Sequence, residues 1–167
     1  MTPSSRRTTA ALLALLTLPS ALAACDSGAA CTSGVIAASA VPAAVVAALA
    51  AEVPSPGAVV WTLEGADYEA AFTAGSVKTA IVISPAGVVR SVETETPVAD
   101  LPPAVRAAVA RDYAGYTVTA AARIAERSPA AVHYEAQLER GTETFDLIYD
   151  ASATLLERID AVTDGCD

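Results

Sequence analysis

Apolar residues recur every four positions in two short segments, which is the spacing of one face of an α-helix. The stripes are Val41, Val45 and Leu49 in the first segment and Leu101, Val105 and Val109 in the second. Each segment carries a proline near its start, where the backbone amide of a helix has no partner to lose. The two segments also share the motif Pro-x-Ala-Val, at Pro42 and at Pro102. This similarity indicates an internal repeat.

After each predicted helix the pattern changes to an alternation of apolar and polar residues, which is typical of half-buried strands. The first set of expected inward positions is Val59, Trp61, Leu63, Tyr68, Ala70, Phe72, Thr79, Ile81, Ile83, Val88 and Val92. The second set is Val118, Ala120, Ala122, Ile124, Val132, Tyr134, Ala136, Leu138, Phe145, Leu147, Tyr149, Leu155 and Ile159. We therefore predict an α+β fold of two tandem repeats, each one helix packed on a four-stranded antiparallel β-meander. The repeats would span residues 39–96 and 97–163, with a C-terminal tail over 164–167.

The N-terminal 24 residues have the features of an export signal. Arg6 and Arg7 precede a short apolar run, and small residues follow it. The junction Leu22-Ala23-Ala24-Cys25 resembles the lipobox of bacterial lipoproteins, which implies lipidation of Cys25 and a flexible tether over residues 25–38. An ordinary secretory signal cut after Ala23 or Ala24 is the alternative.

With Cys25 assigned to a lipid, two cysteines remain near opposite ends of the exported chain. We expect Cys31 and Cys166 to pair, because an oxidising compartment favours a disulfide. Two free thiols are the alternative, since the sequence does not show that the two α-carbons come within bridging distance.

Charge excludes one large class of partners. Removal of the signal leaves 8 of the 10 basic residues against 19 acidic ones, a net charge of −11. Such a surface repels phosphate backbones, so nucleic-acid binding is not expected, and the single lysine, Lys78, argues against a polybasic membrane patch.

Candidate catalytic chemistry is sparse. His133 is the single histidine and falls among polar strand positions, which favours a solvated side chain over a catalytic base or a zinc ligand. Glu93 and Glu95 lie on one side of an extended segment and could be an acid/base pair or calcium ligands. The simpler interpretation is a charged sheet edge that discourages strand association. We predict no catalytic residues, no metal and no cofactor.

The sheet faces turned away from the helices differ between the two repeats. In the second, that face is polar and suited to water, with Thr117, Thr119, Arg123, His133, Glu135, Gln137, Glu139, Thr144 and Asp146. In the first, it carries the candidate partner-binding residues Val60, Thr62, Ala71, Ala80 and Val82, beside Glu69. This apolar surface either packs against the other repeat or binds a partner, and both explanations stay open.

Several local motifs carry a family resemblance. The helix openings Val-Pro-Ala-Ala-Val and Leu-Pro-Pro-Ala-Val, the Tyr-Glu-Ala strand starts at Tyr68 and Tyr134, and the strand Phe145-Asp-Leu-Ile-Tyr-Asp resemble the PepSY-like family. That family is itself similar to the β-lactamase inhibitor protein (BLIP), which grips an enzyme with its sheet. The turns at Pro85-Ala86-Gly87 and Ala151-Ser152-Ala153 depart from the family's usual Asp-x-Asp-Gly-like turn.

Together with the lipobox-like junction, the resemblance implies a non-catalytic, lipid-anchored protein of the bacterial cell envelope that faces the periplasm or the exterior. It would bind a protein partner there, such as a peptidase or another envelope enzyme, and inhibit or regulate it. The competing hypothesis is a structural or small-molecule-binding lipoprotein with an apolar pocket between the repeats.

Overall fold

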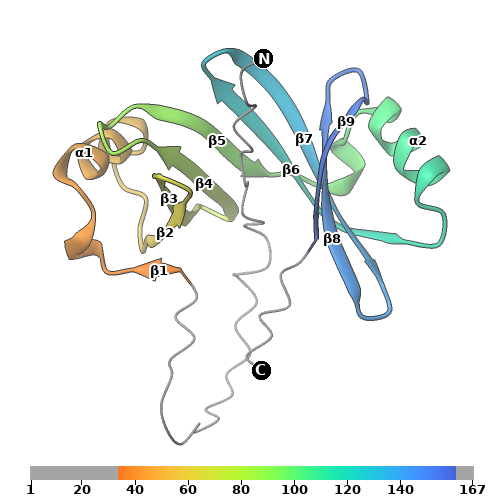
Figure 1. Ribbon diagram of the computed structural model, residues 1–167, viewed down its shortest axis with the longest axis horizontal. Coiled ribbons are helices and arrows are strands. Elements are labelled where there is room, and N and C mark those ends of the chain that lie inside the picture. The colour runs from red at the N-terminus through yellow and green to blue at the C-terminus, as the bar shows by residue number, and fades with distance from the viewer. Residues whose placement is uncertain (1–33, 161–167) are drawn as a thin grey trace, which may run out of the picture.

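The computed structural model describes residues 34–160 of the chain (Figure 1). Its strands are β1 (Val35–Ile36), β2 (Val60–Glu64), β3 (Asp67–Ala74), β4 (Val77–Ile83), β5 (Val89–Glu95), β6 (Thr117–Arg127), β7 (Ala130–Arg140), β8 (Glu143–Asp150) and β9 (Leu155–Asp160). Its helices are α1 (Ala43–Glu52) and α2 (Pro103–Asp112), each preceded by a short 3-10 turn, η2 (Ala38–Ala40) and η3 (Val98–Asp100). None of the helices in this range is long and apolar enough to cross a membrane.

The strands form one continuous antiparallel sheet, and this overturns the predicted fold class. The spatial order β1 to β9 equals the order in sequence, so nine strands make a single sheet instead of two separate four-stranded meanders. The joint is the pairing of β5 with β6, from Ser91 opposite Glu126 to Glu95 opposite Ala122. The predicted division after residue 96 therefore falls between neighbouring, hydrogen-bonded strands. Alternating patterns define the faces of each strand but not which strands become neighbours, so the sequence did not reveal this joint.

Two further strand assignments were also wrong. A register shift between Val118 and Ala120 reverses the faces of β6, so Ala121 is the buried residue on the helix side, while Ile124 points to the opposite face. Such an irregularity inserts a residue and shifts the alternation that follows it. On β9, Leu155 is 43% exposed, and Ile159 lies opposite Asp146 on the side away from the helices. Val35 and Ile36, placed in the predicted tether, pair with β2 as the edge strand β1.

Both helices cover the same face of the sheet, each at its own end (Figure 1). Helix α1 packs with β2–β5 around a core of Val41, Val45, Leu49, Trp61, Ala70, Phe72, Ile81 and Ile83. Helix α2 packs with β6–β8 around Leu101, Val105, Ala108, Val109, Ala121, Ala136, Leu138, Phe145, Leu147 and Tyr149. An ion pair between Arg127 on β6 and Glu52 at the end of α1, with N and O 3.0 Å apart, also connects the two ends. The opposite face, named here the open face, receives neither helix.

The turn between β4 and β5 contacts the first turn of α1 so closely that only glycine fits. Gly87 has φ +79°, and a β-carbon there would lie 2.7 Å from the carbonyl oxygen of Ala44. Gly75 also has a positive φ, +67°, but a β-carbon there would meet nothing within 4 Å. A substitution at Gly75 therefore tests backbone strain alone, whereas a substitution at Gly87 adds a steric clash to that strain.

We expect Gly87→Ala to lower the free energy of unfolding by about 2 to 4 kcal/mol, because the left-handed backbone conformation and the clash with α1 both add cost. Gly75→Ala should cost only about 1 to 2 kcal/mol from the backbone term. Urea unfolding of both variants measures the difference, and equal losses would show that the contact with Ala44 has no energetic weight.

Candidate functional site

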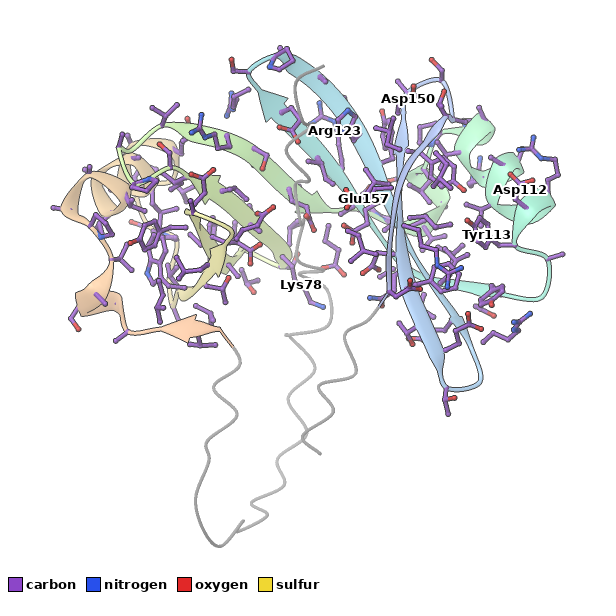
Figure 2. The ribbon with its side chains drawn as sticks, viewed as in Figure 1. Lys78, Asp112, Tyr113, Arg123, Asp150 and Glu157 are labelled. Atoms are coloured by element: carbon purple, nitrogen blue, oxygen red, sulfur yellow. The ribbon has the colours of Figure 1, made fainter. Side chains whose placement is uncertain are left out.

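A cleft of about 690 Å³ lies in the middle of the open face. Residues from β2–β9 line it, so it spans the β5–β6 joint between the two ends of the sheet. Its walls are Glu64, Gly65, Ala66, Asp67, Glu69, Ala80, Val82, Arg90, Ser91, Glu93, Ile124, Glu126, Ser128, Pro129, Ala131, His133, Ile148, Leu156 and Glu157. We call it the acidic cleft, because its six carboxylic acids outnumber its two basic side chains, Arg90 and His133. Figure 2 shows Glu157 on β9, the last strand that contributes to it.

Four carboxylic acids on the open face are almost completely buried, and we call them the buried acids. Glu69 on β3 is 4% exposed, Glu93 on β5 is 7%, Glu135 on β7 is 1% and Asp146 on β8 is 2%. Acidic residues are rarely buried without a partner, because transfer of an ionised carboxylate from water is costly. Their burial corrects the prediction that water solvates the face containing Glu135 and Asp146.

Burial and mutual repulsion keep protons on these groups. Desolvation raises the pKa of Glu69 to about 7, although a hydrogen bond from Thr62 partly opposes the shift. Desolvation, followed by repulsion from Asp146 and Glu69, raises the pKa of Glu135 to about 8. Desolvation also raises the pKa of Asp146 to about 6, and it raises that of Glu93 well above its usual range, with added repulsion from Glu135. Near neutral pH the cluster therefore holds a mixture of protonated and ionised carboxyls.

Two oxygen atoms of the buried acids lack a hydrogen-bond donor. Among residues 34–160, no group donates to Glu135 Oε1 or to Asp146 Oδ1, although both atoms are inaccessible to water. A buried acceptor left unpaired costs about 1 to 3 kcal/mol, so such atoms are uncommon in folded proteins. These two oxygens therefore lie unpaired beneath the surface of the open face.

The interpretation of Glu93 as part of a charged edge was wrong, because β5 is an interior strand paired on both sides. Glu93 lines the acidic cleft, whereas Glu95 lies 3.9 Å from the Nζ of Lys78, which Figure 2 labels on β4. The carboxyls that interact with Glu93 come from other strands, with Glu135 first among them. The sequence suggested a pair of Glu93 with Glu95 because the two are close along the chain. Strand pairing instead brings Glu93 near carboxyls from other strands.

The five candidate partner-binding residues do share the open face. Val60 is 40% exposed and Thr62 and Val82 are half-buried, while Ala71 and Ala80 form a small buried cluster of their own. Ala80 and Val82 also line the acidic cleft. The apolar surface predicted on the first half therefore borders Glu93 as well as Glu69, which the sequence had already placed beside it.

The remaining predictions concern single residues. His133 is half-buried and lines the cleft, and within residues 34–160 no hydrogen bond joins it to the hydroxyl of Ser91 or Ser128. The same range contains no group of three or more His, Cys, Asp or Glu side chains arranged to hold a metal ion. Cys25, Cys31 and Cys166 lie outside the described residues, so lipidation and the disulfide stay predictions.

The arrangement resembles proteins of known structure. A BLIP-like protein from Bacteroides fragilis superposes with a TM-score of 0.56 at 26% sequence identity, over 75% of this chain and 90% of that one. The chain has a BLIP-like fold. A DUF2874 family protein from Bacteroides uniformis superposes with a TM-score of 0.62 at 19% identity, over 71% of this chain and 88% of that one.

A third solved structure, a protein of Bacteroides eggerthii described as periplasmic by prediction, gives a TM-score of 0.63 at 17% identity, over 71% of this chain and 88% of that one. No protein-family model and no curated protein sequence matches the chain. The similarities support the BLIP-like part of the predicted kinship and do not identify the PepSY-like family or a tandem duplication.

Proposed function

We propose that the protein is a non-catalytic module of the bacterial cell envelope whose open face binds another protein and restrains or regulates it. The observation that carries this proposal is the open face itself. Val60 and Val82 expose apolar surface there, next to Ala71 and Ala80, while both described helices pack on the opposite side. Small and branched apolar residues beside a cleft form a surface that a protruding segment can enter.

The BLIP-like fold supports a protein partner, and the export signal with its lipobox-like junction supports an envelope location with a lipid anchor at Cys25. The periplasmic description of the Bacteroides eggerthii protein agrees with that location. A purely apolar small-molecule pocket fits less well, because six carboxylic acids line the cleft between the two ends of the sheet.

Site-specific crosslinking in the native envelope tests the proposal. A photoreactive amino acid at Val60, on the open face, should yield one discrete protein adduct, whereas the same group at Val46, which is 44% exposed on α1, should not. The captured protein is then purified and titrated against the wild type and Val82→Asp. Because Val82→Asp places a charge in the contact surface, we expect about tenfold weaker binding or more.

Circular dichroism serves as the folding control for Val82→Asp. A folded variant that binds the captured protein as tightly as the wild type would contradict the proposal. Equal adducts from positions 60 and 46 would also contradict it, since the open face would then have no special role.

A further inference from the structure

The acidic cleft is short of positive charge. Arg90 is already engaged at the rim, where its Nε donates to Asp67 Oδ2 at 3.3 Å. Lys78, the other strongly basic side chain near this face, lies against Glu95. Among residues 34–160, neither forms an ion pair with the buried acids. Within the described residues, the buried acids therefore have no basic side chain as a counter-charge.

Unpaired carboxyl oxygens at and beneath the cleft are a second, independent observation. Glu135 projects from β7 between Ala122 on β6 and Ile148 on β8, onto the face where Ile148 lines the cleft. Its Oε1 accepts no hydrogen bond within the described residues, and neither does Asp146 Oδ1. Neither of these two residues lines the cleft, whereas Glu69 and Glu93 do. Glu93 is 7% exposed and accepts no hydrogen bond within the described residues, so it is the buried carboxyl that a ligand in the cleft meets first.

The chemistry of these acceptors selects the ligand. A guanidinium group is permanently positive and offers five N–H donors in a planar fork that matches carboxylates. It is also more weakly hydrated than an ammonium group, so it enters a partly buried cleft at lower cost. A neutral amide could donate hydrogen bonds but could not offset the repulsion among the carboxyls.

We propose that the acidic cleft receives an arginine side chain of the partner protein, which donates to the buried acids. This inference rests on the proposed function and adds the chemical identity of the contact. Because a cation favours the ionised carboxyls, entry of the arginine displaces protons from the buried acids to solvent. Binding should therefore strengthen as the pH rises.

The direction of the pH effect depends on every titratable group on the open face. Besides the buried acids these are Glu64, Asp67, Lys78, Arg90, Glu95, Glu126, His133, Glu139, Asp150 and Glu157. Protonation of the buried acids weakens the attraction for arginine below neutral pH.

A capped tripeptide, acetyl-Ala-Arg-Ala-amide, is the probe, and the peptide with citrulline in place of arginine is its uncharged control. Backbone amide shifts of the isotopically labelled protein should move at Ile124 and Ile148 with the arginine peptide only. The affinity should rise about tenfold from pH 6 to pH 8, with release of protons measured by calorimetry in buffers of different ionisation enthalpy.

Matched variants locate the effect. Glu93→Gln should weaken the arginine peptide about tenfold, whereas Glu139→Gln, at an exposed position of the same face, should change its affinity less than twofold. Shifts scattered over the acidic surface, equal effects of the two variants, or equal binding of the citrulline peptide would overturn the inference. A Ca²⁺ titration that moves Ile124 and Ile148 while the arginine peptide does not would overturn it as well.

The two proposals can fail separately. If Val60 captures a partner but the arginine peptide does not bind the cleft, the proposed function is retained and this inference is wrong. Binding of the arginine peptide without any adduct at Val60 would retain the cleft's chemistry and remove the protein partner, and with it the inference as stated.

Discussion

The free energy of unfolding is expected to fall as the pH rises from about 4.5 to 8. Glu69 and Glu135 have folded-state pKa values of about 7 and about 8, both above the ordinary 4.5. The folded protein therefore retains protons that the unfolded chain has released, so stability is fully present below pH 4.5 and is lost as the pH passes each raised pKa. Asp146, with a pKa of about 6 against 3.8, acts in the same direction.

The loss across this window should be on the order of 3 kcal/mol or more, since one unit of pKa shift corresponds to about 1.4 kcal/mol. Glu143 and Asp150 have lowered pKa values, the first through a hydrogen bond from Tyr116 and the second through hydrogen bonds from the backbone of Thr154 and Ser152. Their contributions are lost only when the pH falls below their ordinary range, so the two sets together place the stability maximum in mild acid.

Glu135→Gln is the decisive variant, because it keeps the shape of the side chain and removes the buried charge. At pH 8.5 it should be more stable than the wild type by roughly 2 kcal/mol, and at pH 4.5 the two should be nearly equal. Urea unfolding followed by the fluorescence of Trp61, the single tryptophan, gives both values. Glu139→Gln is the matched control, and the same pH slope in Glu135→Gln and the wild type would contradict the assignment.

A second large effect is expected from Phe145→Ala, which should lower the free energy of unfolding by about 3 to 5 kcal/mol. Phe145 is fully buried, with ring centroids 5.6 Å from that of Tyr113 and 5.0 Å from that of Tyr116. The guanidinium carbon of Arg158 lies 3.8 Å from the centre of its ring. One side chain thus joins the end of α2, the start of β6, and strands β8 and β9.

The location of Trp61 makes the same variant a test of the continuous sheet. Trp61 belongs to the α1 core at the other end. Because β5 and β6 are hydrogen-bonded neighbours, loss of Phe145 should lower the urea midpoint reported by Trp61 as well as that reported by circular dichroism. Phe72→Ala, which removes the corresponding ring beside Trp61, is the reference. If Phe145→Ala leaves the urea midpoint reported by Trp61 unchanged, the two ends of the sheet unfold independently.

The sequence identified many core positions because alternation reports them directly. Trp61, Ile81, Leu138 and Phe145 were all expected on the helix side and are buried there. The reversal of β6 was not predictable, since a register shift leaves both alternating sets apolar around Ala121 and Ala122. The joining of β5 to β6 depends on hydrogen bonds between backbones, which carry no side-chain signature.

The site was less predictable than the fold. Glu93, Glu135 and Asp146 lie at polar positions of alternating strands, where a solvated side chain is the usual outcome. Their burial results from the assembly of β3, β5, β7 and β8 on one face, so no single strand contains the signal. The apolar residues Val60 and Val82 were located from the sequence, and the structure adds that they border the acids.

The arrangement of strands in the order of their synthesis has a kinetic consequence. Every described strand finds its hydrogen-bonding neighbour in the strand directly before or after it. Most connections are short turns, and the two longer ones contain the helices α1 and α2, so closure of the sheet joins only segments that are near in sequence. A chain that emerges N-terminus first can add one hairpin after another to a growing nucleus. Assembly of this kind does not wait for distant segments, which limits the time that unpaired strand edges spend in reach of other unfolded chains.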